Sequence, residues 1–204
     1  MSYVALRFYA ELNDFLRDAR KQTRFKIELN RRTSVKDLIE SLGVPHTEVE
    51  VILANGKSVD FSYIVKREDE LSIYPMFESV DVTPILQLRE EPLRDTRFVL
   101  DCHLGRLARY LRQFGFDTLY RNDYTDDELA DTSAREHRIL LTRDRNLLKR
   151  SIITHGYFIR EYDPRKQLDE VIRRFDLRNT GMLLSSSPPT IPWVSRCSMF
   201  DRSC

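Results

Sequence analysis

The sequence predicts two domains, a small α+β unit followed by an α/β unit with a parallel sheet. The chain has 204 residues, and domains cluster at roughly 100 to 150 residues, so two domains suit its length. The first part places one amphipathic helix among several strands, whereas strands and helices alternate in the second part. Hydrophobic residues make up 41% of the chain, which is enough apolar surface for real cores.

The first predicted domain covers residues 1–79. Thr33 or Ser34 supplies an N-cap for its helix, and Gly43 is a common helix stop. One helix covering a sheet is an α+β arrangement. The helix is expected in TSVKDLIESLG, and the strands are expected in YVALRFYA, RFKIEL, VEVILANGK, VDFSYIV and ELSIYPMF.

A predicted linker over residues 80–96 leads to the second domain, residues 97–178. Alternation of strands and helices there predicts a parallel sheet with helices on both faces. Residues 179–204 show no periodicity, so an irregular, disordered tail is expected. The strands are expected in RFVLD, FDTLY, RILLT and YFIREY, and the helices in LGRLARYLRQF, DDELADTSAREH, RNLLKRS and PRKQLDEVIRRF.

Composition excludes several classes of protein. No apolar run approaches the roughly 18 residues that cross a bilayer, and the start carries charges where a signal peptide is apolar, so a cytoplasmic protein without membrane contact is expected. The three cysteines include no CxxC pair, which argues against a disulfide framework. Neither a P-loop nor a GxGxxG run is present, which disfavours a nucleotide cofactor.

Acidic residues follow three of the predicted strands of the second domain. Asp101 ends RFVLD, Asp126 and Asp127 follow FDTLY, and Asp144 comes two residues after RILLT. Residues just past parallel strands gather at one sheet edge, where open α/β sheets bind ligands. Clustered carboxylates need a cation, and Mg²⁺ or Mn²⁺ suits oxygen ligands. This pattern predicts hydrolysis of a nucleic-acid backbone, with water as the nucleophile. The alternative is that Asp126 and Asp144 merely cap helices.

Basic residues are concentrated in the same domain. Residues 97–178 contain 17 Lys and Arg against 14 Asp and Glu, whereas residues 1–78 contain 12 against 13. Arg106 and Arg109 recur on the helix after Asp101, and Arg143 and Arg145 flank Asp144, so these four arginines are candidates to contact RNA phosphates. The alternative is a solvated face with intrahelical ion pairs.

Cys102 and His103 directly follow Asp101. Adjacent residues on an extended segment point to opposite faces, so the pair is not expected to serve one site. Cys102 is interpreted as a small buried residue and His103 as a residue that starts the helix and faces the acids.

The second domain resembles the Mut-seven-type C-terminal RNase family, a branch of the PIN-domain nucleases. The resemblance lies in RFVLDCHLGRLARYLRQFGFDTLY and TDDELADTSAREHRILLTRDRNLLKR and covers about residues 97–175. It implies a PIN-like fold and a metal-dependent enzyme that cuts RNA. The metal-binding acids that it implies are Asp101, Asp126 and Asp144, with Asp127 competing for the middle role.

The first domain resembles the ubiquitin-like β-grasp module that often precedes this RNase domain, and it is similar to small sulfur-carrier proteins. Sulfur carriers act through a free C-terminal Gly-Gly, whereas YPMFESVDV continues here into the next domain. The resemblance therefore implies a docking or regulatory module that could engage a protein partner.

Two departures from the RNase family concern its metals. Members usually carry a zinc ribbon with two CxxC pairs after the last helix, and the absence of such pairs makes zinc unexpected here. Residues 179–204 are interpreted as a truncated or altered ribbon region. Asn146 stands where many PIN enzymes place another acid, which predicts weaker ion binding.

The leading hypothesis is thus a Mg²⁺- or Mn²⁺-dependent ribonuclease. The alternative is a non-catalytic RNA-binding or adaptor protein that retains the fold and binds RNA without turnover. A third hypothesis makes the first domain the functional half, as a partner-docking module.

Overall fold

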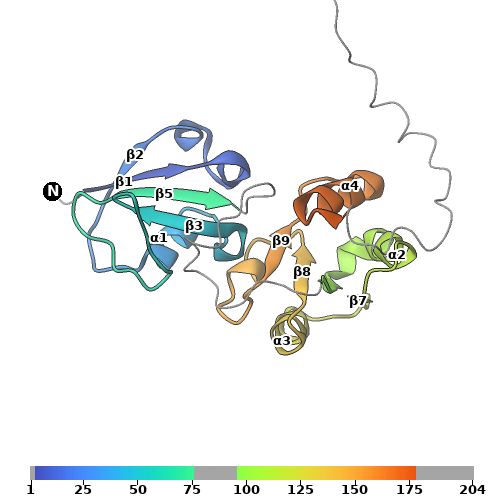
Figure 1. The fold of residues 1–204 in the computed structure, drawn as a ribbon. Helices are drawn as coiled ribbons and strands as arrows, with labels where there is room; N and C mark the ends of the chain where they lie inside the picture. The colour runs from blue at the N-terminus through green and yellow to red at the C-terminus, as the bar shows by residue number, and fades with distance from the viewer. Residues whose placement is uncertain (1–2, 76–95, 178–204) are drawn as a thin grey trace, which may run out of the picture.

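The computed structural model describes residues 3–75 and 96–177, which form two domains, each with its own sheet (Figure 1). The first sheet has the strand order β2 (Phe25–Glu28), β1 (Tyr3–Phe8), β5 (Glu70–Pro75), β3 (Val49–Ala54) and β4 (Lys57–Ser58). The second has the order β7 (Thr118–Tyr120), β6 (Phe98–Leu100), β8 (Ile139–Thr142) and β9 (Gly156–Phe158). The predicted linker, apart from Thr96, and the predicted tail lie outside the described residues. The predicted architecture of an α+β domain followed by an α/β domain is confirmed.

The first domain is a mixed sheet with one α-helix. β1 pairs in parallel with β5 and antiparallel with β2, while β3 pairs antiparallel with β4 and β5. The helix begins after Ser34, whose side chain accepts a hydrogen bond from the backbone of Asp37, and it buries Val35, Leu38 and Ile39 in the core. The elements are β1 (Tyr3–Phe8), η1 (Ala10–Phe15), η2 (Asp18–Arg20), β2 (Phe25–Glu28), α1 (Val35–Ser41), η3 (His46–Glu48), β3 (Val49–Ala54), β4 (Lys57–Ser58) and β5 (Glu70–Pro75).

The strand predicted in VDFSYIV is wrong. Residues 59–65 contain turns and one isolated bridge, between Ser34 and Ile64. The carboxylate of Asp60 accepts hydrogen bonds from the backbone and hydroxyl of Ser62, which closes a local turn. Turn chemistry at Asp60 therefore overrides the strand propensity of the apolar residues around it.

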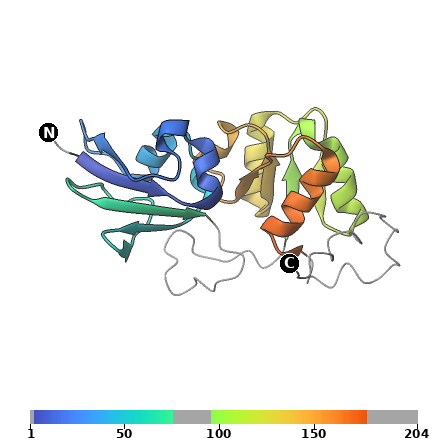
Figure 2. The ribbon, with the colours of Figure 1, turned by 90° about the horizontal axis from the view of Figure 1, so that it is seen from above.

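The second domain is a three-layer α/β unit with an all-parallel sheet. Alternate residues of its strands face opposite layers. Phe98 and Leu100 pack with α2 and α4, whereas Val99 packs with α3. The helices α2 and α4 lie on one face of the sheet and α3 on the other (Figures 1 and 2). The elements are β6 (Phe98–Leu100), η5 (Cys102–Leu104), α2 (Gly105–Gln113), β7 (Thr118–Tyr120), α3 (Asp126–Glu136), β8 (Ile139–Thr142), η6 (Leu147–Lys149), β9 (Gly156–Phe158) and α4 (Pro164–Arg174).

The first domain packs against the outer edge of the second sheet. Among the strands of the described ranges, β9 pairs with β8 alone. On its other side, the backbone N–H of Phe158 donates to Oε1 of Glu48, which is fully buried, at 2.6 Å. The ring of Phe158 contacts Phe15 edge to face. An exposed strand edge promotes unwanted pairing with other chains, so the first domain protects β9 from it.

Polar contacts extend this junction along both domains. His46 Nε2 lies 2.9 Å from the carbonyl oxygen of Ile153, and Lys149 Nζ donates to the carbonyl of Glu40. Arg174 forms an ion pair with Glu11. The two domains are therefore joined by specific side-chain contacts.

None of the helices in the described ranges is both long and apolar enough to span a bilayer.

Candidate active site

Asp101 and Asp144 lie at the carboxyl ends of two neighbouring parallel strands, β6 and β8. Thr142, the last residue of β8, connects them. Its buried hydroxyl donates to Oδ2 of Asp101 at 2.8 Å, and the hydroxyl oxygen accepts the backbone N–H of Asp144 at 2.9 Å. One hydroxyl therefore orients both predicted site residues at the sheet edge.

Asp101 is a buried carboxylate with several donors around it. Burial raises its pKa, but hydrogen bonds from Cys102, Thr142 and His103 outweigh burial and hold the pKa of the carboxyl below its usual value. Asp101 is therefore ionised at neutral pH and presents a negative charge at the sheet edge.

Asp126 and Asp127 occupy the first turn of α3, but neither caps the helix. Thr125 is the N-cap and forms a capping box with Glu128, so the capping interpretation of Asp126 is wrong. The side chain of Asp127 is 84% exposed and forms an ion pair with Arg150. The charge of Asp127 is therefore already paired with an arginine side chain.

Asp144 has a local structural role as well. Its Oδ1 accepts the backbone N–H of Asn146 at 2.7 Å, which closes the turn before η6. The N-cap of η6 is Asn146, so the alternative that Asp144 caps this helix is wrong. Its other oxygen, Oδ2, takes no part in that bond.

The predicted aspartates do not form a compact cluster. Within residues 3–75 and 96–177, the one group of three His, Cys, Asp or Glu side chains whose donor atoms lie within 4.8 Å of one another is Asp101, Cys102 and His103. The premise that Cys102 and His103 lie on an extended segment and point to opposite faces is wrong, because these residues lie in the 3₁₀ turn η5 with their side chains in contact. Cys102 is also only partly buried.

The four predicted arginines fall into two pairs. Arg106 and Arg109 are exposed on α2, which buries Leu107, Ala108 and Leu111 on its other side. Arg143 donates to the carbonyl oxygens of Arg160 and Glu161 and lies over the ring of Tyr162. The guanidinium of Arg145 lies about 5 Å from the rings of Phe15 and Phe158. Thus Arg106 and Arg109 are exposed on α2, and Arg145 is exposed although it contacts both rings. Arg143 is partly buried by its contacts within the protein.

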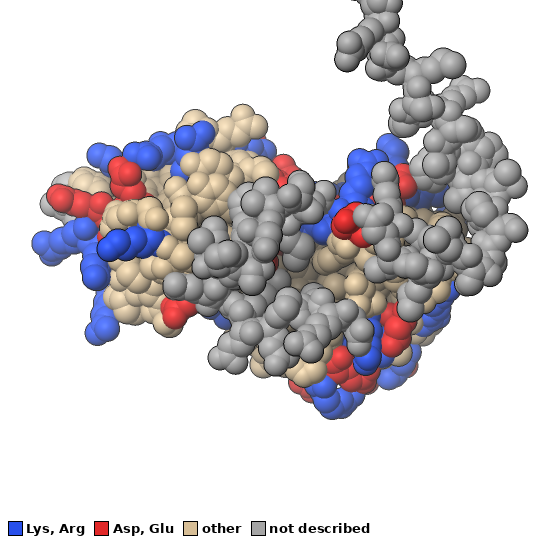
Figure 3. Space-filling view, viewed as in Figure 1, with Lys and Arg blue, Asp and Glu red and all other residues tan. Residues whose placement is uncertain are grey.

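The surface does not carry a uniform charge. On the face in Figure 3, acidic and basic side chains are intermixed around α3, the helix that contains Asp126 and Asp127. A polyanion that approaches this helix would therefore meet charges of both signs.

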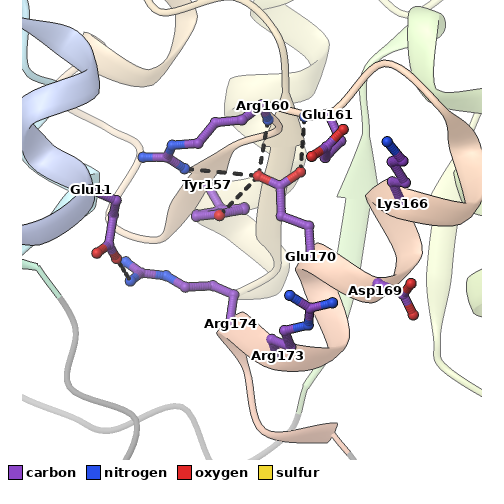
Figure 4. Close-up of a pocket in the computed structure, with 9 residues that line it drawn as sticks. All are labelled: Glu11, Tyr157, Arg160, Glu161, Lys166, Asp169, Glu170, Arg173 and Arg174. Carbon is purple, nitrogen blue, oxygen red and sulfur yellow. Dashed lines mark hydrogen bonds and ion pairs between the residues drawn. The ribbon is translucent and has the colours of Figure 1, made fainter. Parts of the chain in front are cut away.

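A pocket of about 590 Å³ lies between α4 and the first domain (Figure 4). Its centre is occupied by Glu170, which accepts hydrogen bonds from the hydroxyl of Tyr157 and from the backbone of Arg160 and Glu161. None of the predicted site residues lines it. The residues that line it are Glu11, Tyr157, Arg160, Glu161, Lys166, Asp169, Glu170, Arg173 and Arg174.

Sequence reasoning missed Thr142 and Tyr120. Thr142 is a polar residue at the end of an apolar buried strand, and such a position in the sequence could have indicated a site residue. Tyr120 donates to the carbonyl oxygen of Cys102 at 2.9 Å, and its ring lies so close to Gly105 that a Cβ there would come within 2.6 Å of its hydroxyl. Gly105 therefore allows Tyr120 to support the backbone beside Asp101.

Comparisons with known proteins agree with this division of the chain. Residues 1–81 match the family model described as Mut7-C ubiquitin, and residues 96–187 match the model described as Mut7-C RNAse domain. No curated protein matches the chain.

Two solved structures of small archaeal modifier protein 1 from Haloferax volcanii also match. They are 15% and 14% identical to this chain, cover 38% of it and 100% and 99% of their own length, and each has a TM-score of 0.30. On the evidence of the two family models, residues 1–81 form a Mut7-C ubiquitin domain and residues 96–187 belong to a Mut7-C RNAse domain.

Proposed function

We propose that this protein is a ribonuclease that hydrolyses RNA phosphodiester bonds with Mg²⁺ or Mn²⁺. The observation that carries the proposal is the bridge that Thr142 makes between Asp101 and Asp144 at the ends of two parallel strands, within a domain that matches an RNase family. The proposal takes from the family resemblance the expectation that these acids form a PIN-like, metal-binding active site.

The donor chemistry suits a divalent ion. Asp101 is ionised, and Asp144 keeps one oxygen outside its turn hydrogen bond. Asp126 lies on the exposed first turn of α3 and would complete the set, with Asp127 as its neighbour. A bound ion would supply activation of water and stabilisation of the leaving oxygen. The protein's part is to fix the two acids: Thr142 donates to the carboxylate of Asp101 and holds the backbone N–H of Asp144.

A second function has specific support. The three aspartates are not gathered within 4.8 Å, Asn146 replaces an acid of the family pattern, and Asp127 is paired with Arg150. These features favour a non-catalytic RNA-binding or adaptor protein. Such a protein would bind RNA in a salt-sensitive way without turnover, so a cleavage assay of the full chain with and without metal separates the two functions.

Arg106 and Arg109 are expected to contact the RNA backbone. Replacing each with alanine should weaken binding of a single-stranded RNA several-fold and reduce the slope of log K against log salt by about 1 for each arginine replaced. Fluorescence anisotropy at several KCl concentrations in EDTA measures both quantities. Arg31→Ala, at an exposed arginine of the first domain, is the matched control. Unchanged slopes in the α2 variants would show that RNA binds elsewhere.

A further inference from the structure

The donor group beside Asp101 combines three kinds of ligand atom. His103 Nδ1 lies 3.2 Å from Oδ1 of Asp101 and 3.3 Å from Sγ of Cys102, and the three donor atoms lie within 4.8 Å of one another. These separations are compatible with a single ion, because metal–ligand bonds to oxygen, nitrogen and sulfur measure about 2.0 to 2.3 Å. The 3₁₀ turn η5 brings consecutive side chains to the same side.

We propose that Asp101, Cys102 and His103 form a site for a borderline transition ion, Co²⁺ or Zn²⁺, in preference to Mg²⁺. The inference rests on the proposed function in one respect, because Asp101 belongs to both sites. Mg²⁺ requires oxygen ligands, whereas imidazole and thiolate favour transition ions. Three protein ligands with an open position are also the usual arrangement of catalytic zinc sites.

The surroundings of the three donors hold them in place. Thr142 donates to Oδ2 of Asp101, so that Oδ1 is directed toward His103. Tyr120 fixes the carbonyl of Cys102. Such supporting contacts typically change metal affinity by about 10- to 100-fold when removed. The side chain of His103 is 74% exposed, so the site opens to solvent and leaves room for water or a phosphate oxygen.

The proposal is tested by Co²⁺ titration followed by absorption spectroscopy. The full chain should carry Cys197→Ser and Cys204→Ser, so that Cys102 is its one thiol. We expect a thiolate-to-cobalt charge-transfer band that persists in excess Mg²⁺ and disappears in Cys102→Ser. His103→Asn should weaken Co²⁺ binding about tenfold or more. His137→Asn is the matched control, because His137 is exposed and its positive φ tolerates asparagine.

The outcomes separate this inference from the ribonuclease proposal. Binding of Co²⁺ that depends on Asp101 but shows no thiolate band and ignores Cys102 and His103 would overturn the mixed-donor site and leave the acidic site standing. Displacement of Co²⁺ by equimolar Mg²⁺ would also overturn it. A thiolate band in a chain that cleaves no RNA would support the mixed-donor site and count against the ribonuclease.

Discussion

Replacing Glu48 with alanine is expected to destabilise the protein by about 2 kcal/mol, because the N–H of Phe158 at the domain junction loses its acceptor. Arg160 loses one of its carboxylate partners but keeps Asp14 and Glu170. Glu48 is fully buried, accepts the backbone N–H of Phe158, and lies 3.4 Å from Nη2 of Arg160. Burial raises its pKa, while Arg160 and Arg174 oppose that rise. The measurement is urea unfolding of the full chain at neutral pH.

Two controls define the origin of this loss. Glu48→Gln keeps an acceptor for the N–H of Phe158 but removes the charge, so an intermediate loss is expected. Glu28→Ala changes an exposed glutamate of β2 and should alter stability by no more than about 0.5 kcal/mol. A loss below about 1 kcal/mol in Glu48→Ala would show that the junction does not depend on this carboxylate.

Replacing Asp101 with asparagine is expected to reduce RNA cleavage by about 100-fold or more while RNA is still bound. The ion held by these acids would contribute several kcal/mol to the reaction, and each 1.4 kcal/mol changes the rate tenfold. Single-turnover cleavage of an end-labelled single-stranded RNA gives the rate, and anisotropy gives the bound fraction.

Asp18→Asn is the matched control for that variant, because Asp18 is an exposed aspartate of the first domain. Thermal unfolding of Asp101→Asn should verify that the fold survives, since asparagine can still accept the hydrogen bond from Thr142. Equal cleavage by the parent and the folded Asp101→Asn variant would exclude Asp101 from the reaction.

The second domain was largely predictable because its signals are local and agree with one another. Its strands are short apolar runs, and Asp163 followed by Pro164 marks the start of α4, where Asp163 caps the helix.

In the first domain, the predicted strand at residues 59–65 was wrong. The hydrogen bonds that Asp60 accepts from Ser62 form a local turn there, in spite of the apolar composition.

The site was only partly predictable, because its geometry depends on contacts between distant residues. The pairing of β6 with β8 brings Asp101 and Asp144 to one edge of the sheet, as a parallel topology implies. Thr142, which links them, belongs to no recognisable sequence motif, so its role could not be predicted. The pairing of Asp127 with Arg150, 23 residues away, cannot be deduced from spacing. Likewise, the burial of Glu48 results from docking of the two domains, and a charged residue is normally expected at the surface.

The most direct test of the central claim is cleavage of a single-stranded RNA by the full chain before and after removal of divalent metal. We predict cleavage in Mn²⁺ or Mg²⁺, its loss in EDTA, and its recovery when metal is restored in excess of the chelator. RNA that remains intact under every metal condition, although the chain binds it, would contradict the ribonuclease and favour the adaptor. Cleavage that persists unchanged in EDTA would contradict the requirement for metal.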